Sequence, residues 1–301
     1  MIIKTNFNGG LYGQIFTWII EFLPYLKRNN IYPKWDMTAD FYGKIFGNHL
    51  LLNYKPNHDN DDVVDFWKLK INIDVEQIDY FNQITNSNDC NFFKHHNNDF
   101  VSANSVWFSY FKFSDEIIEE VNNFMQELKG KTLGLHYRGT DKINTEGGYI
   151  NIEIFKQMVD DYLSKNEINN IIIFTDERKT FNILKEYYNN YNIKYTNDFS
   201  NLSVDDILFI NNKIYNFDLD LSYKQCLIDT LILSKCDVNI KTSSQFSAWS
   251  KIFNPNLETY RVSSFVHDWF PDSRIPIYKS SDENVNKILN NILLNESKKI
   301  N

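Results

Sequence analysis

The second half of the chain alternates apolar segments of strand length with amphipathic segments of helix length. Residues 170–174 form a nearly continuous apolar run, which is typical of a strand buried on both faces. Because strands that alternate with helices usually pair in parallel, the pattern predicts a doubly wound parallel sheet of the α/β class. The expected strands are 132–137, 170–174, 193–195 and 238–240, and the expected helices are 151–163, 181–188, 223–235 and 244–253.

A further amphipathic segment precedes these elements and predicts a helix that joins two domains. Ser114 can cap its N-terminus, Asp115 and Glu116 suit the positive end of the helix dipole, and Gly130 ends it. A chain of 301 residues is long enough for two domains. We therefore expect domains at 1–113 and 114–301, and a final helix at about 283–301 that packs back on the first domain.

The N-terminal half gives fewer signals. Residues 2–4 predict a strand, a glycine-rich turn follows at 8–14, and a helix with Pro24 near its end comes next. Because glycine lets backbone N–H groups approach a ligand and a helix N-terminus favours anions, this layout suits a phosphate, with Gly10 and Gly13 as candidate contacts. A tight turn that binds nothing remains the alternative. Residues 30–112 are rich in aromatic side chains and predict no clear element.

Composition narrows the class of protein. Hydrophobic residues make up 43% of the chain and aromatic residues 16%, which argues for a substantial core and against disorder. The net charge is −8 without a long Lys/Arg block, so we expect no nucleic-acid partner. Three cysteines without CxxC spacing argue against a disulfide framework and a structural zinc site. No secretory signal or membrane-spanning segment is visible, so we expect a cytoplasmic protein.

The strand predicted at 132–137 ends in a dense set of polar side chains. These are His136, Arg138, Asp141, Lys142 and Glu146. The carboxyl ends of parallel strands are where α/β proteins bind ligands. Two cations beside two carboxylates suit a substrate that has a negatively charged leaving group and a hydroxyl to deprotonate. A surface Arg–Asp ion pair beside a buried histidine is the alternative interpretation.

Polar residues also follow two other predicted strands. Asp176 and Glu177 come after the strand at 170–174, and residues 241–245 lie directly before a helix. Hydroxyl and N–H groups at a helix N-terminus bind phosphate well. Asp229, on the helix before that strand, carries a carboxylate that can accept two hydrogen bonds from a guanine edge.

These segments resemble motifs of the α-1,6-fucosyltransferases. Residues 136–142, followed by Thr145 and Glu146, are similar to the HxRRTDK…TE motif of that family. Residues 229–237 and 242–246 resemble its next two motifs, and the turn at 9–14 is similar to a glycine motif shared with α-1,2- and protein O-fucosyltransferases. The likeness covers the C-terminal half fairly continuously, but only the first turn of the N-terminal half.

The resemblance implies a GT-B fold, in which two Rossmann-like domains face each other across a cleft. It also implies inverting transfer of fucose from GDP-fucose to a glycan or protein hydroxyl, with no metal and no cofactor beyond the donor substrate. The N-terminal domain would then lie on the acceptor side. We expect partners to be the nucleotide-sugar donor and a glycan or glycoprotein acceptor.

Roles in donor binding carry over by position. Arg138 would bind the β-phosphate, while His136 and Asp229 would contact the nucleoside, Asp229 at the guanine. Asp176 matches an acid of the donor pocket, and Glu177 stands where the family often has a second Asp. Ser243, Ser244 and Gln245, at the start of the helix expected at 244–253, would bind the donor at its phosphate oxygens.

The chemical step would use the first motif. Glu146 matches the proposed general base, and Arg138 would stabilise the departing diphosphate. Asp141 is the competing base, although we favour it as the partner that orients Arg138 or Lys142. Gly139 replaces the second Arg of the family motif, which removes a bidentate phosphate contact that Lys142 replaces only as a point charge.

Several alternatives remain open. Gly139 favours a GT-B transferase that uses a different nucleotide sugar, and a non-catalytic glycan- or nucleotide-binding protein on the same scaffold is a third possibility. Residues 218–220 form a DxD triplet of the kind that holds a metal-bound diphosphate, although isolated triplets arise often by chance. Four aromatic residues are candidates to stack on an acceptor sugar, but such residues more often belong to the core: Trp35, Trp67, Trp107 and Tyr110.

Overall fold

The computed structural model describes residues 1–5, 11–38, 43–57, 62–65, 100–138, 150–196, 219–262, 270–284 and 286–287. The chain divides into two compact units. The first comprises residues 1–121, 220–228 and 268–270, and the second comprises 122–219, 229–267 and 271–301. The helices α6 (Asp115–Gln126) and α9 (Leu219–Lys235) therefore each contribute residues to both units. The boundary expected after residue 113 stays a prediction.

The first unit contains a small parallel sheet. Its strands are β1 (Ile2–Lys4), β2 (Lys34–Asp36) and β4 (Val63–Asp65), in the order β2-β1-β4. Both neighbours pair with β1 in parallel, and the predicted opening strand is confirmed. Two further strands, β3 (Leu50–Leu52) and β5 (Phe111–Phe113), pair antiparallel.

The helix after the glycine-rich turn is longer than the sequence suggested. A π-helical turn, η1 (Leu11–Phe16), runs directly into α1 (Thr17–Arg28). We expected Pro24 near the helix end, and it lies inside α1, about one turn before the last residue, Arg28. Proline removes one backbone hydrogen bond, and in α1 the buried apolar face outweighs that loss.

Aromatic side chains build the core of the first unit. The ring of Trp107, on α5 (Phe100–Tyr110), lies 4.7 Å from that of Phe16 and 4.8 Å from that of Phe111. Trp107 and Tyr110 are fully buried, so the core interpretation of these two residues is confirmed. A short 3-10 helix, η2 (Gly43–Ile45), adds its buried Ile45 to this unit.

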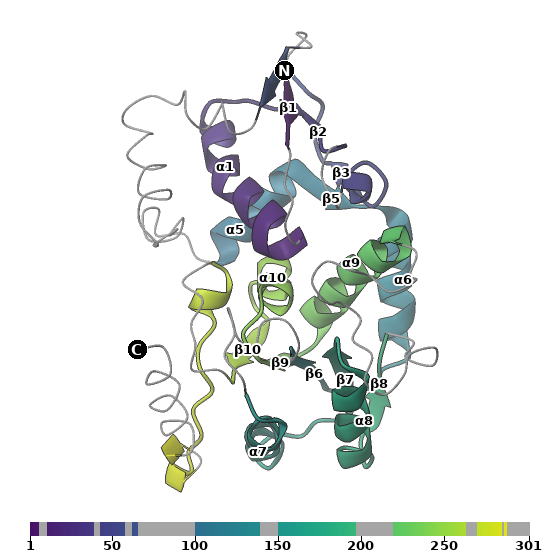
Figure 1. Ribbon diagram of the computed structural model, residues 1–301, viewed down its shortest axis with the longest axis vertical. Coiled ribbons are helices and arrows are strands. Elements are labelled where there is room, and N and C mark those ends of the chain that lie inside the picture. The colour runs from purple at the N-terminus through teal and green to yellow at the C-terminus, as the bar shows by residue number, and fades with distance from the viewer. Residues whose placement is uncertain are drawn as a thin grey trace. The chain divides into compact units, whose positions relative to one another are not determined.

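The second unit is built on a five-stranded parallel sheet, and this confirms the predicted α/β class (Figure 1). The strand order is β10-β9-β6-β7-β8. From β6 the chain therefore adds β7 and β8 on one side, and it then returns to add β9 and β10 on the other side of β6. The point between β6 and β9 is a topological switch point, where α/β sheets bind ligands. The strands are β6 (Thr132–Tyr137), β7 (Asn170–Thr175), β8 (Asn192–Lys194), β9 (Val238–Lys241) and β10 (Glu258–Arg261).

Helices cover both faces of this sheet. Figure 1 shows α7 (Ile152–Leu163) and α8 (Arg178–Tyr187) on one side and α9 and α10 (Gln245–Phe253) on the other. Asn151 caps α7 as predicted, because its side chain accepts the N–H of Glu153 at 2.9 Å. The helices α8 and α9 begin three and four residues earlier than predicted, at Arg178 and Leu219.

Alternate residues of β6 face the helices on opposite sides of the sheet. Leu133 and Leu135 join the apolar cluster that includes residues of α7 and α8. Gly134 faces the other layer, where a Cβ atom would lie 2.3 Å from Asn239 Oδ1 and 2.8 Å from Leu233 Cδ2. Only glycine therefore fits at this position, and β6 approaches α9 closely.

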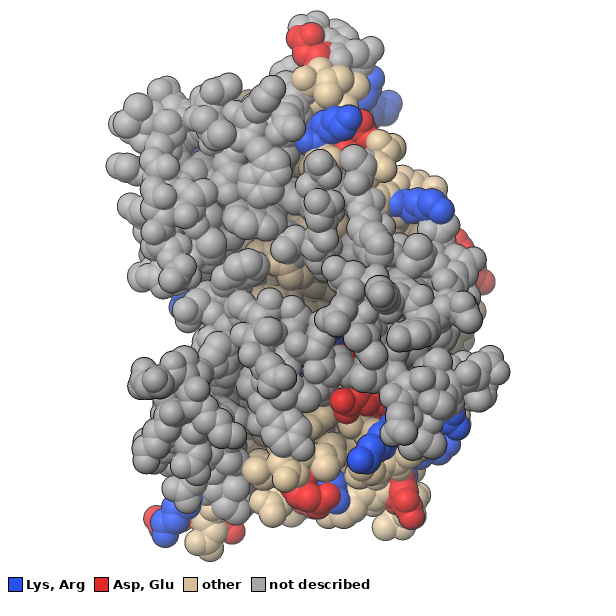
Figure 2. Space-filling model, viewed as in Figure 1, with Lys and Arg blue, Asp and Glu red and all other residues tan. Residues whose placement is uncertain are grey.

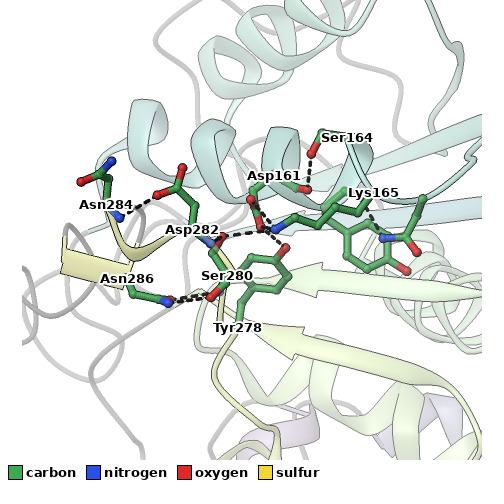
Figure 3. A network of polar contacts seen from close by, with 10 residues as sticks. Asp161, Ser164, Lys165, Tyr278, Ser280, Asp282, Asn284 and Asn286 are labelled. Carbon is green, nitrogen blue, oxygen red and sulfur yellow. Dashed lines mark hydrogen bonds and ion pairs between the residues drawn. The ribbon is translucent and has the colours of Figure 1, made fainter.

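The chain returns to the second unit after β10. The 3-10 helix η3 (Asp272–Arg274) is followed by residues that reach α7, as Figure 3 shows. Tyr278 Oη donates to Asp161 Oδ2 at 2.5 Å, and Lys165 Nζ donates to both Asp161 oxygens at 2.6 and 2.7 Å. Hydrogen bonds from Lys165 and Tyr278 outweigh the effect of burial and lower the pKa of Asp161. Most of the expected final helix lies outside the described residues; 283–284 and 286–287 are helical.

Candidate active site at the carboxyl edge of the parallel sheet

The strand register places three chain segments side by side at one edge of the sheet. His136 pairs with Lys241, and Tyr137 pairs with Thr175. The residues that follow these strands therefore begin at the same level, around the switch point between β6 and β9. The structure thus brings together the ends of the three strands that the sequence marked as polar.

Arg138 is held from both neighbouring strands. Its Nε lies 3.3 Å from Asp176 Oδ2, after β7, and its backbone N–H donates to Thr242 Oγ1, after β9, at 2.8 Å. The Arg138 side chain is 20% exposed and the Asp176 side chain 6%. The guanidinium therefore has a fixed anchor inside the protein and remains partly accessible at the edge of the sheet.

Glu177 lies beside this ion pair. Burial raises the pKa of its carboxyl, and the negative charge of Asp176 raises it further. A hydrogen bond from Thr180 Oγ1, at 2.5 Å, acts in the opposite direction. Glu177 is also the residue before α8, with extended backbone. The Glu177 carboxylate therefore accepts a hydrogen bond from the first turn of α8.

His136 is buried, with 4% of its surface exposed. Its Nδ1 lies 2.9 Å from Ser247 Oγ on α10, and its ring centroid lies 5.1 Å from that of Phe246. Burial, together with the charges of Lys241 and Arg138, holds the pKa of His136 well below its usual range. The imidazole is therefore neutral at pH 7, and its predicted contact with a nucleoside stays a prediction.

The loop before α10 carries the predicted phosphate ligands. The backbone N–H of Thr242 donates to the carbonyl of His136 at 2.9 Å, and Ser243 Oγ donates to Asp272 Oδ2. Ser244 precedes the first residue of α10, Gln245, and its side chain does not cap the helix. Ser243 is thus turned toward the protein interior, whereas the half-buried Ser244 and Gln245 lie at the helix N-terminus.

Sequence reasoning missed a buried ionic cluster behind this loop. Lys241 Nζ donates to Asp272 Oδ1, and Arg261 Nη1 lies 3.7 Å from Asp272 Oδ2. All three residues are at most 2% exposed. The charges of Lys241 and Arg261 outweigh the effect of burial and lower the pKa of Asp272. The one sequence signal was a lysine at the end of a buried strand.

The remaining predicted residues are placed as follows. Asp229 is on α9 in the second unit and is 5% exposed. Gly13 lies in the π-helical turn of the first unit. Four predicted site residues lie outside the described residues: Gly10, Asp141, Lys142 and Glu146.

The DxD triplet is only partly described, since Asp218 falls outside and Asp220 is in the first turn of α9. Among the described residues, no three His, Cys, Asp or Glu side chains are grouped to hold a metal ion. The helices in the described part of the chain include none with the length and apolar character needed to cross a membrane. On the face in Figure 2, acidic and basic side chains are interspersed where the surface is described.

Comparisons with known proteins show the family of this chain. The family model for α-(1,6)-fucosyltransferase N- and catalytic domains matches residues 77–248, more than half of the chain. No curated protein matches.

Three solved structures share the fold at low sequence identity. The NodZ α-1,6-fucosyltransferase soaked with GDP-fucose has a TM-score of 0.54 at 12% identity, covering 84% of this chain and 92% of that one. Fucosyltransferase NodZ from Bradyrhizobium has a TM-score of 0.53 at 12% identity, with 83% and 91% covered. NodZ co-crystallised with GDP has a TM-score of 0.51 at 13% identity, with 83% and 91% covered. By the extent of the family match, this chain belongs to the α-(1,6)-fucosyltransferases and is a glycosyltransferase.

Proposed function

We propose that this protein transfers fucose from GDP-fucose to a hydroxyl of a glycan or protein, with inversion and without a metal ion. The proposal includes the GT-B arrangement and the cytoplasmic location expected from the sequence. It is supported by the family match and by one observation in particular. That observation is Arg138, which is anchored at the switch point and bonded to the loop that leads into α10.

The donor diphosphate fits this edge of the sheet on electrostatic grounds. Arg138 supplies a guanidinium, which matches phosphate geometry better than an ammonium does. Ser244 and Gln245 stand at the N-terminus of α10, where the helix dipole favours an anion. Asp176 binds the Nε side of Arg138, and this interaction limits the orientations that the guanidinium can adopt.

The reaction is a single displacement at the anomeric carbon of the donor sugar. The acceptor oxygen forms a bond to this carbon as the bond to the β-phosphate oxygen breaks, and the electron pair leaves with GDP. Glu146 takes the acceptor proton, with Asp141 as the competing base. Arg138 stabilises the charge that develops on the leaving diphosphate.

The test separates chemistry from donor binding. Glu146→Gln keeps the size of the side chain but removes the base, so transfer from GDP-fucose should be abolished while the Kd for GDP, measured by calorimetry, stays nearly unchanged. Asp141→Asn tests the competing base, because loss of transfer in this variant and not in Glu146→Gln would assign the base role to Asp141. Equal loss of transfer and of GDP binding in Glu146→Gln rejects the base role. Loss of activity on treatment with EDTA rejects metal independence.

Gly139 gives a specific reason to test a second donor. The missing guanidinium favours a nucleotide sugar that needs one phosphate contact fewer. A thermal-shift screen with GDP, UDP and their sugars decides between them, because a ligand at 100 times its Kd stabilises the folded state by about 2.7 kcal/mol. Stabilisation by UDP and not GDP selects the second donor. If no nucleotide stabilises the protein, the non-catalytic glycan-binding alternative is favoured.

A further inference from the structure

Asp272 lies directly behind the loop that we assign to the donor phosphates. It is fully buried in η3, about thirty residues after that loop in the sequence. One carboxylate oxygen accepts a hydrogen bond from Lys241 Nζ and the other accepts one from Ser243 Oγ. Its backbone carbonyl accepts a third, from Arg261 Nη1, at 3.2 Å. Asp272 therefore joins β9, β10 and the loop at one point.

The consecutive residues of the loop are fixed from two sides. Lys241 and Ser243 are bonded to Asp272, whereas Thr242 between them is bonded to β6 and to the backbone of Arg138. Removing the Asp272 contacts would free one side of the loop while leaving the other intact. The conformation of Ser243 and the start of α10 thus depend on Asp272.

The charges of the described residues in this cluster do not balance. Two cations, Lys241 and Arg261, surround one carboxylate, and all three groups are buried. Buried charge is costly unless it is compensated. The excess positive charge lies behind the N-terminus of α10, where it adds to the helix dipole and favours an anion in front of the loop.

We propose that Asp272 is a positioning residue for donor binding, which acts through Ser243 and Lys241 to hold the loop at residues 242–245 in its anion-binding conformation. This inference rests on the proposed function. Asp272 is too deeply buried to touch the donor itself. The alternative is that Asp272 contributes to stability only, in which case its loss would lower the melting temperature without a specific effect on the donor.

Three variants of the full chain test the inference, together with a matched control. Ser243→Ala removes the loop hydroxyl and leaves the ionic cluster in place. Lys241→Met removes the second loop contact and leaves Asp272 balanced by Arg261. Asp272→Asn removes the central charge. The control is Asp161→Asn, which weakens the attachment of the same C-terminal segment to α7, at the contacts of Figure 3.

Each protein is measured for melting temperature, for Kd of GDP by calorimetry below the lowest melting temperature, and for KM and kcat with GDP-fucose. Ser243→Ala and Lys241→Met should each raise the Kd for GDP and the KM for the donor about fivefold to tenfold, which is the effect of one hydrogen bond. The change in kcat should be smaller. Asp161→Asn should lower the melting temperature while the Kd stays within about twofold.

A double-mutant cycle shows whether Ser243 acts through Asp272. If it does, Ser243→Ala combined with Asp272→Asn should weaken GDP binding no more than the worse single variant does. If the increase in Kd for the double variant equals the product of the two single increases, Ser243 contacts the ligand independently of Asp272, and the inference is overturned. If Asp272→Asn does not fold, Ser243→Ala combined with Lys241→Met replaces this pair.

Three other outcomes bear on the positioning role of Asp272. Unchanged GDP affinity in both Ser243→Ala and Lys241→Met overturns the positioning role but leaves the proposed function intact. An equal loss of affinity in Asp161→Asn points to general destabilisation and overturns it as well. If the unmodified protein binds no GDP, the proposed function fails, and the inference fails with it.

Discussion

Replacing Arg138 by lysine tests the donor site most directly, because it keeps the charge and removes the planar fork. The Nε of Arg138 lies 3.3 Å from Asp176 Oδ2, where two unit charges attract by about 5 kcal/mol at an effective dielectric constant of about 20. Arg138 is one-fifth exposed, so solvent screening makes the net contribution smaller. Lysine retains most of this attraction, and the fold should therefore be little affected.

Catalysis should suffer more than stability. Hydrogen bonds to charged groups contribute roughly 1.5–3 kcal/mol each, and lysine cannot bind Asp176 and a phosphate in the same planar arrangement. Loss of one such bond in the transition state corresponds to a decrease of about 10- to 150-fold in kcat/KM. The backbone hydrogen bond from residue 138 to Thr242 does not depend on the side chain and should persist.

The assay is steady-state transfer from GDP-fucose, together with calorimetry of GDP and a melting curve. Arg28→Lys at the exposed end of α1 is the control for the same chemical change. A kcat/KM for Arg138→Lys within threefold of the unmodified protein would refute the clamp role. A drop in melting temperature that matches the loss of activity would show that the pair with Asp176 is structural.

Three further outcomes are expected. The pKa of His136 is lowered on folding, so the unfolded state binds more protons below about pH 6.5. The free energy of unfolding should therefore fall as pH drops through that value, by up to about 1.4 kcal/mol per pH unit. Urea titrations at pH 5 to 7.5 should show that it depends less steeply on pH in His136→Asn. Gly134→Ala should cost about 1–3 kcal/mol in urea unfolding, because its Cβ meets Asn239 at 2.3 Å. Trp107→Ala should destabilise the first unit by about 3–5 kcal/mol, and a differential scanning calorimetry profile unchanged by it would contradict the aromatic core.

Four of the five strands in the sheet of the second unit were predictable because their signals are local, whereas the polar strand β10 was not predicted. Buried parallel strands are apolar throughout, and a residue such as Asn151 caps its helix wherever that helix packs. Topology explains why Arg138 meets Asp176, because parallel strands end at a common edge, but the partner that we favoured for Arg138 or Lys142 from the sequence was Asp141. Periodicity therefore predicted the strand ends at this edge of the sheet, but not the ion pair between Arg138 and Asp176.

Other features depend on tertiary contacts that no local pattern encodes. Asp272 is an ordinary acid in a polar stretch of sequence, and only the fold reveals that Lys241 and Arg261 converge on it. Pro24 is a helix breaker by local rules, but α1 continues through it because its apolar face is buried. The aromatic residues between 30 and 112 gave no period, and where this range is described, rings from separate elements pack on each other rather than along one face.

The path of the chain after β10 has a consequence for shortened forms of the protein. Residues 271–287 are the last described part of the second unit, and they supply both the counter-ion at Asp272 and the contacts of Tyr278 with α7. A polypeptide that stopped before residue 271 would contain every strand of the five-stranded sheet but would leave the buried Lys241 and Arg261 without the carboxylate of Asp272, their counter-ion among the described residues. Uncompensated burial of that kind costs about 3–5 kcal/mol, a large share of the stability of an ordinary domain. The smallest autonomous version of this sheet therefore has to include a segment that forms none of its strands.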